Sequence, residues 1–164
     1  MPASTPLPSA PRTDAPDRGA LLDSARRLRQ AALDGLAYRP LQGRNLGLLG
    51  RDSASTEARL FTAAAQELGA RVVWLPTSPW ADDVVARDTA RLMGRLYDAV
   101  ECQGLAATEV AWLGQHAGVP VFDGLAGPAH PSAALAEGLE GGSADPLNRR
   151  CVLQAVLLGA LAGH

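Results

Sequence analysis

The 164-residue chain contains no lysine, so arginine supplies all 15 of its basic side chains. This absence excludes a Walker-type phosphate lysine, a Schiff-base lysine and a lysine general base. The 17 acidic residues bring the formal net charge to -2, whereas a nucleic-acid-binding protein would carry a basic stripe. We therefore expect no nucleic-acid partner.

Cysteine and long apolar runs are also scarce. Cys102 and Cys151 lie far apart without the spacing of a metal site, and each sits in an apolar run typical of a buried free thiol. The sequence suggests neither a metal nor a cofactor. The run Ala155–Ala162 is too short to span a bilayer, and the first 18 residues lack the apolar segment of a signal peptide. We expect a cytoplasmic protein with no membrane partner.

The chain divides into four parts. Residues 1–18 hold five of the twelve prolines and predict a disordered tail. Residues 19–140 form one domain, which is long enough to bury a real core. Residues 141–146 are predicted to be a flexible linker. Residues 147–164 form a helix that is apolar almost all round, and such a helix is expected to pack back on the domain.

Within the domain, short apolar runs alternate with helical patterns. The expected strands are Asn45–Leu49, Arg71–Leu75, Asp98–Cys102 and Val119–Phe122. The expected helices are Ala20–Leu36, Ser55–Leu68, Val84–Leu96, Ala106–Ala117 and Pro131–Leu139. This alternation predicts an α/β fold, a single domain with a four-stranded or slightly larger parallel sheet flanked by helices. Ligands bind such sheets at the carboxyl ends of the strands.

A specific resemblance to a known family rests on two runs of the sequence. The first is DTARLMGRLYDA at 88–99, and the second is GVPVFDGL at 118–125, followed by His130-Pro131. They resemble the N-terminal, carbamoyl-phosphate-binding domain of the aspartate/ornithine carbamoyltransferases, and the likeness extends over Leu21–Leu139. It implies that family's α/β fold and its trimeric association. The closing run at 145–163 resembles the family's final helix. Because the amino-acid-binding domain of the family lies between these two pieces, we expect that second domain to be absent here.

The family's phosphate-binding loop reads S-T-R-T-R and opens a helix whose N–H groups and arginines hold the phosphate. Here Ser55, Thr56 and Arg59 take the first, second and fifth positions, while Glu57 replaces the central arginine. A unit charge about 4 Å from phosphate contributes roughly 4 kcal/mol at an effective dielectric of about 20, and Glu57 reverses its sign. Alternatively, Glu57 complements the helix dipole and Ser55 or Thr56 is an ordinary cap.

The other ligand loops depart from the family in the same direction. The arginine of its Y-R-G motif is Gln103 here, and the glutamine of its H-P-x-Q motif is Ala133. The loop at 76–83 offers no Gln or Lys, and its Trp80 is interpreted as a hydrophobic cap or subunit contact. His130 is retained. It is interpreted as a remnant donor to the carbonyl of carbamoyl phosphate, or as a cap left from ancestry.

These departures favour a carbamoyltransferase-like protein that has lost catalysis and serves as a binding, scaffold or regulatory subunit in amino-acid or pyrimidine metabolism. Its expected partners are further copies in a homotrimer, and a full-length carbamoyltransferase or a neighbouring enzyme. The alternative is a half-enzyme in which Ser55, Thr56, Arg59 and His130 still bind carbamoyl phosphate and another chain supplies the amino-acid site. A third hypothesis is a sensor for a different small anion, attracted by Arg51 and Arg59.

Overall fold

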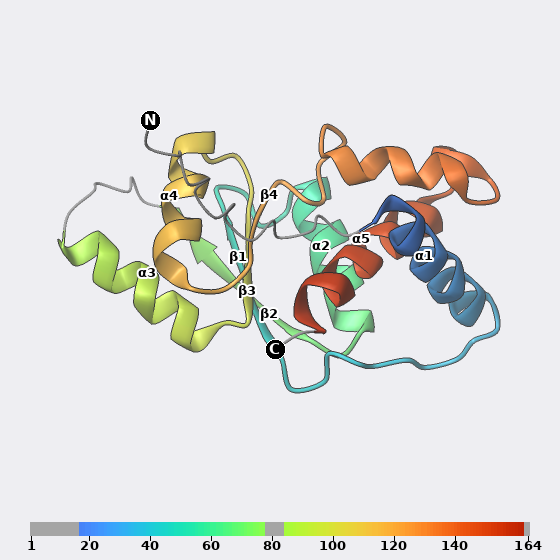
Figure 1. The fold of residues 1–164 in the computed structure, drawn as a ribbon, viewed down its shortest axis with the longest axis horizontal. Helices are drawn as coiled ribbons and strands as arrows, with labels where there is room; N and C mark the ends of the chain where they lie inside the picture. Colours follow the sequence, from blue (N-terminus) through green and yellow to red (C-terminus); the bar gives the residue numbers. More distant parts are fainter. Residues whose placement is uncertain (1–16, 78–83, 163–164) are drawn as a thin grey trace, which may run out of the picture.

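The computed structural model describes residues 17–77 and 84–162, and it contains one parallel sheet in the strand order β2-β1-β3-β4 (Figure 1). The α/β fold with a four-stranded parallel sheet, expected from the sequence, is confirmed. The strands are β1 (Asn45–Gly50), β2 (Arg71–Pro76), β3 (Ala99–Cys102) and β4 (Val121–Asp123). The helices are α1 (Arg18–Leu33), α2 (Thr56–Glu67), α3 (Val84–Leu96), α4 (Ala107–Ala117), η1 (Pro131–Gly138), η2 (Gly142–Ala144) and α5 (Pro146–Leu161).

Helices cover both faces of the sheet. Figure 1 shows α3 and α4 on one side of the strands and α1, α2 and α5 on the other. Side chains alternate along a strand, so β1 sends Leu46 and Leu48 into the core beneath α2 and α5 and Leu49 into the core beneath α3 and α4. The core beneath α2 and α5 is built mainly from alanine and leucine, and the core beneath α3 and α4 adds valine, methionine and cysteine.

Three segments differ from the sequence predictions. Residues Pro131–Gly138 form a 3-10 helix, η1, where an α-helix was expected. The connector expected to be flexible contains the 3-10 turn η2, which begins after Gly141 at a φ of 94°. Arg18 belongs to α1, and the Asp17 carboxylate caps that helix by accepting from the Gly19 N–H at 3.1 Å. The rest of the expected tail, residues 1–16, lies outside the described residues.

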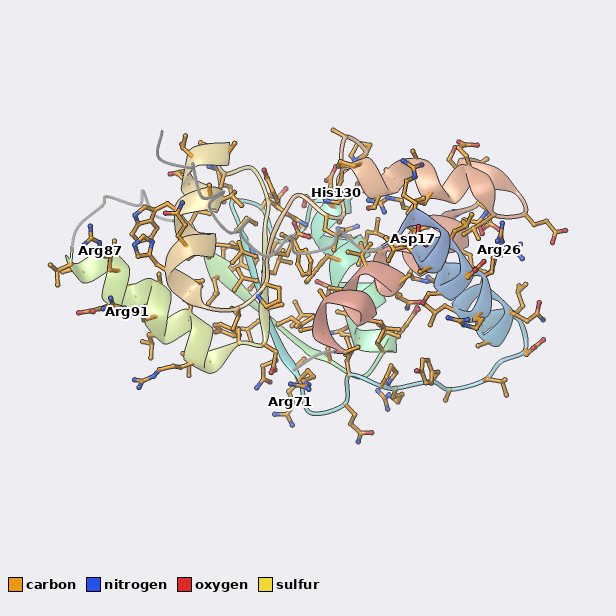
Figure 2. All side chains as sticks on the ribbon, in the orientation of Figure 1. Asp17, Arg26, Arg71, Arg87, Arg91 and His130 are labelled. Atoms are coloured by element: carbon orange, nitrogen blue, oxygen red, sulfur yellow. The ribbon has the colours of Figure 1, made fainter. Side chains whose placement is uncertain are left out.

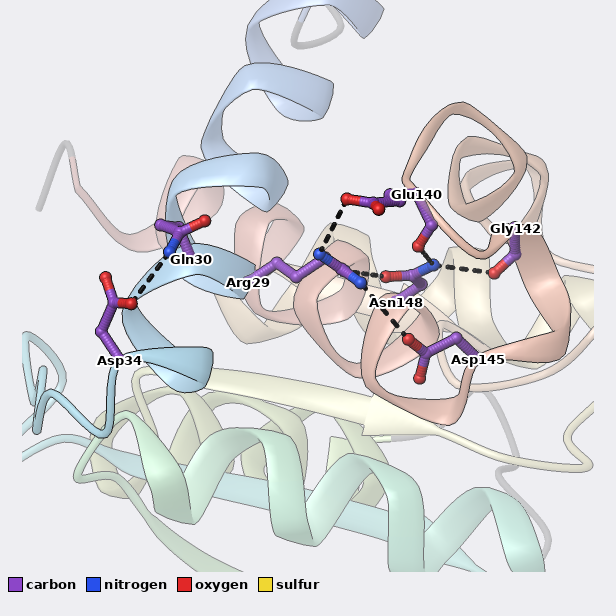
Figure 3. A network of polar contacts seen from close by, with 7 residues as sticks. All are labelled: Arg29, Gln30, Asp34, Glu140, Gly142, Asp145 and Asn148. Atoms are coloured by element: carbon purple, nitrogen blue, oxygen red, sulfur yellow. Dashed lines mark hydrogen bonds and ion pairs between the residues drawn. The ribbon is translucent and has the colours of Figure 1, made fainter.

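A polar cluster ties the connector and α5 to α1 (Figure 3). The buried Asn148 side chain accepts a hydrogen bond from Arg29 Nε at 2.8 Å, and its amide donates to the carbonyls of Glu140 at 2.9 Å and Gly142 at 2.8 Å. The Arg29 guanidinium also lies 3.8 Å from the Glu140 carboxylate and 3.6 Å from that of Asp145. This cluster explains why the connector is ordered although it is rich in glycine.

The burial of the cysteines and the spread of the surface arginines agree with what the sequence predicts. Cys102 and Cys151 are free and buried, as expected, and burial raises the pKa of their thiols to about 12 and about 11. The labelled surface arginines of Figure 2 come from α1, β2 and α3, so the basic charge is spread over the molecule. Over residues 17–77 and 84–162, no helix is both long enough and apolar enough to cross a membrane.

Candidate functional site

A first hollow of about 360 Å³ lies where the strands end. Its position follows from the topology, because β1, β3 and β4 are parallel and their carboxyl ends meet at one edge of the sheet. It is lined by Arg51, Asp52, Ser55, Glu57, Gln103, Gly104, Gly124 and Gly127. The structure thus brings together four of the residues singled out from the sequence, namely Arg51, Ser55, Glu57 and Gln103.

A second hollow, of about 630 Å³, adjoins the first, since Glu57 lines both. It lies between the start of α2, the loop after β4, η1 and α5. It is lined by Thr56, Glu57, Ala126, Pro128, Ala133, Ala134, Glu137, Ser143 and Arg149. Thr56 and Ala133, also chosen from the sequence, therefore face this second space, while Arg59 is exposed on α2 and lines neither hollow. Trp80 lies outside the described residues.

The first turn of α2 is capped by its own residues. The Ser55 hydroxyl accepts a hydrogen bond from the Ala58 N–H at 3.1 Å, the bond of an ordinary N-cap. Glu57 stands in the first turn, where a negative charge complements the helix dipole. The local geometry therefore satisfies the helix terminus, and it also places a half-buried carboxylate between the two hollows.

His130 is held by the start of η1 (Figure 2). Its Nδ1 lies 3.1 Å from the Ser132 backbone nitrogen and 2.8 Å from the Ser132 hydroxyl. A backbone N–H only donates, so Nδ1 accepts and the neutral ring carries its proton on Nε2. Burial and the charge of Arg149 lower the pKa of His130, with Asp123 acting in the opposite direction. The imidazole is thus a neutral N–H donor near neutral pH.

Arg149 is a site residue that the sequence reasoning missed. Its Nη2 donates to the carbonyl of Leu125 at 2.5 Å and to that of Gly127 at 3.2 Å. Its buried Nη1 has no hydrogen-bond partner among the described residues. Burial lowers the pKa of this guanidinium, and Glu101 raises it. The sequence feature that could have identified it is the pair Arg149-Arg150 near the start of an apolar helix, where the helix dipole disfavours cations.

Glu101 was missed as well. It is fully buried on β3, where its Oε1 accepts a hydrogen bond from the Leu125 N–H at 2.9 Å. Burial raises the pKa of this carboxyl to about 8, and the charge of Asp123 raises it further. The backbone N–H groups of residues 124–126 act in the opposite direction and lower it. Its Oε2 has no hydrogen-bond partner within the described part of the chain. The signal was an acidic residue inside an otherwise apolar strand.

The groups around the two hollows suit a small anion. Arg149 supplies a guanidinium with a free donor and Gln103 an amide whose buried Nε2 lacks a partner among the described residues, whereas His130 lines neither hollow. The N-terminus of α2 adds backbone N–H groups and its dipole. Asp52, Glu57 and Glu137 also line the hollows and oppose these donors with negative charge. Across the described ranges, no three His, Cys, Asp or Glu side chains cluster closely enough to hold a metal ion.

The fold and these groups define an α/β domain with a site that contains charged and polar side chains at the carboxyl edge of its sheet. Residues 11–140 match the family model described as "Aspartate/ornithine carbamoyltransferase, carbamoyl-P binding domain". The chain belongs to this family, as the resemblance in its sequence indicated.

Curated relatives and solved structures agree with this placement. An ornithine carbamoyltransferase of Actinobacillus pleuropneumoniae serotype 5b is 38% identical over 119 residues, covering 71% of this chain and 36% of that protein. The structure of the Pyrococcus furiosus ornithine carbamoyltransferase shares 26% identity at a TM-score of 0.62, covering 74% of this chain and 39% of that one. The structure of the Thermus thermophilus ornithine carbamoyltransferase shares 28% identity at a TM-score of 0.58, covering 73% of this chain and 42% of that one. The chain thus spans little more than a third of the curated relative's length.

Proposed function

We propose that this chain is a carbamoyltransferase-like protein that has lost catalysis and acts as a binding, scaffold or regulatory subunit in amino-acid or pyrimidine metabolism. The observation that carries the proposal is the position of Glu57. Its carboxylate lines both hollows, at the place where the family resemblance leads us to expect a phosphate-binding arginine. Gln103 and Ala133, the two further departures, line one hollow each.

The electrostatic cost explains why these departures matter. Carbamoyl transfer needs a fixed clamp on the phosphate and stabilisation of charge on the carbonyl oxygen as the transition state forms. Replacing one clamp cation by an anion changes an attraction of a few kcal/mol into a repulsion, at the effective dielectric of about 20 that suits a partly exposed site. Loss of the clamp also leaves carbamoyl phosphate poorly oriented, so positioning of the substrate and stabilisation of its transition state weaken together.

The domain plan supports the same proposal. Only residues 139–145 join η1 to α5, and the Asn148 cluster holds them in place. In the family the amino-acid-binding domain lies between the corresponding pieces. We propose that the chain comprises an N-terminal segment ahead of α1, the domain up to Glu140, a linker and the closing helix α5, without that second domain between η1 and α5.

Activity is the direct test. Purified protein, given carbamoyl phosphate and either ornithine or aspartate, is expected to form no carbamoylated product above the uncatalysed background. The assay follows the ureido product, and a genuine ornithine carbamoyltransferase run alongside serves as the positive control. Steady product formation that scales with the concentration of this chain would contradict the loss of catalysis.

A second candidate function is a half-enzyme that binds carbamoyl phosphate and depends on another chain for the amino-acid site. The partnerless Nη1 of Arg149 favours it, because a buried donor without an acceptor is costly and an anion would satisfy it. Adding the partner chain to the assay separates the two functions. Product formation faster than that of the partner chain alone supports the half-enzyme, whereas a rate equal to that of the partner alone supports the scaffold.

Restoring the cation gives a prediction for the site itself. Glu57→Arg is expected to raise the affinity for inorganic phosphate at least about tenfold at low salt, because two units of charge change beside the hollow. Isothermal titration measures it. Asp88→Arg is the matched control, since it makes the same charge change on the exposed surface of α3. Equal gains in both variants would show that only the net charge matters.

Assembly is also part of the proposal. We expect a homotrimer, and an exposed apolar surface supports association. Val73 and Trp74 on the edge strand β2 are 41% and 39% exposed, and Val84 and Val85 at the start of α3 are 72% and 74% exposed. Exposed apolar side chains, two of them on an edge strand, are typical of an interaction surface. Light scattering coupled to size exclusion tests the expectation, and a clean monomer at micromolar concentration would contradict it.

A further inference from the structure

Leu125 is held from two sides, by the buried carboxyl of Glu101 and by the half-buried guanidinium of Arg149. Its N–H donates to Glu101 Oε1 at 2.9 Å, and its carbonyl accepts from Arg149 Nη2 at 2.5 Å. Arg149 also donates to the Gly127 carbonyl at 3.2 Å, three residues before His130. One carboxyl and one guanidinium therefore clamp the loop that leads from β4 to η1, and this loop borders both hollows.

Each member of the clamp has one unused atom. Glu101 Oε2 and Arg149 Nη1 are buried, and neither meets a hydrogen-bond partner in the described part of the molecule. Arg149 lines the second hollow, whereas Glu101 lies behind the loop, fully buried and outside both linings. Glu101 therefore reaches either hollow only through Leu125 and Arg149.

We propose that Glu101 is a positioning residue of the site and that it couples the binding of an anion beside Arg149 to the binding of a proton on its own carboxyl. With the proton present, the carboxyl is neutral, still accepts from Leu125 and leaves the charge of Arg149 for the anion. Without the proton, the carboxylate neutralises Arg149 from behind and repels an incoming anion. This inference rests on the anion-binding role proposed for the site.

The neighbouring charges set the pH range over which this coupling acts. Burial raises the pKa of Glu101 to about 8, and Asp123 at the end of β4 adds to the rise. Burial and Arg149 lower the pKa of His130, which is therefore neutral above pH 7. Burial and the Glu101 charge raise the pKa of Cys102 to about 12, and the chain has no lysine. Glu57 and Glu137 line the same hollow as Arg149. Within the described part of the chain, Glu101 is the group beside Arg149 whose raised pKa makes its charge change between about pH 7 and pH 9.5.

Sulfate is the probe, because its charge is constant over this range while that of phosphate is not. Wild-type affinity for sulfate, measured by isothermal titration, is expected to fall about tenfold or more between about pH 7 and pH 9.5, since binding requires a proton that is lost above pH 8. In Glu101→Gln the amide oxygen still accepts from Leu125 and no charge develops. Its affinity for sulfate is expected to stay constant within about a factor of two.

A second measurement needs no variant. Titrations of the wild type in two buffers of different ionisation enthalpy report the protons taken up with each sulfate. Uptake of a fraction of a proton is expected above pH 8, shrinking toward zero at pH 7. A flat wild-type profile without proton uptake would overturn the role of Glu101 and leave the anion site standing. Absence of sulfate binding at every pH would overturn the anion site, and the inference with it.

Discussion

Gly94→Ala is expected to destabilise the domain by about 3 to 5 kcal/mol, or to prevent it from folding. Gly94 lies on α3 near its end, and a Cβ added there would stand 1.7 Å from the Ala117 carbonyl oxygen on α4. That oxygen belongs to backbone, so no side-chain rotation relieves the overlap. The two helices would have to separate, which opens the core that contains Met93 and Leu113.

Chemical denaturation followed by circular dichroism measures the effect, and a matched substitution controls for it. Gly114 also lies within a helix, α4, and a Cβ there would find only the Val121 Cβ at 4.0 Å. Gly114→Ala is therefore expected to be neutral or to stabilise the protein by up to about 1 kcal/mol, the difference in helix propensity. Similar losses in Gly94→Ala and Gly114→Ala would contradict the close approach of α3 and α4.

Asn148→Ala is expected to cost about 3 to 5 kcal/mol and to lower the melting temperature by on the order of 10 °C. The substitution removes three hydrogen bonds at a fully buried position. It leaves Arg29 and the carbonyls of Glu140 and Gly142 without their partner, and buried polar groups without partners are costly. The loss falls where α5, α1 and the connector meet, so α1 is expected to lose hydrogen-exchange protection first.

Gln30 provides the control within the same region. It is an amide on α1 next to Arg29, and its side chain donates to Asp34 at 2.9 Å in an exposed position (Figure 3). Gln30→Ala is expected to change stability by less than about 0.5 kcal/mol, because water replaces the lost bond. If Asn148→Ala were as mild as Gln30→Ala, the cluster would not be what orders the connector.

Much of the fold was predictable because hydrophobic periodicity is local. The run Val84–Leu96 was assigned to a helix with the bounds that the structure gives to α3. The segment Pro131–Gly138 was harder, since proline and small residues start an α-helix and a 3-10 helix equally well. The connector at 141–146 was interpreted as flexible because its glycines are visible in the sequence, whereas the Asn148 side chain that holds it comes from the next helix.

The residues of the candidate site also differ in how far the sequence could predict them. Ser55, Glu57, Gln103 and Ala133 were found because they fall at recognisable motif positions, and the structure places each of them beside one of the two hollows. Glu101 and Arg149 stand 48 positions apart in the sequence. Only the packing of α5 against the loop after β4 brings both onto Leu125.

By itself the sequence determined the α/β class, the order of the strands along the chain and the family, because apolar periods and motif residues act over a few neighbouring positions. It also determined that arginine supplies every basic side chain of the site, since the chain has no lysine. The tertiary structure alone decided which charges are buried. Desolvation depends on what surrounds a group in space, and it makes Glu101 a proton-binding group and leaves Arg149 with a free donor.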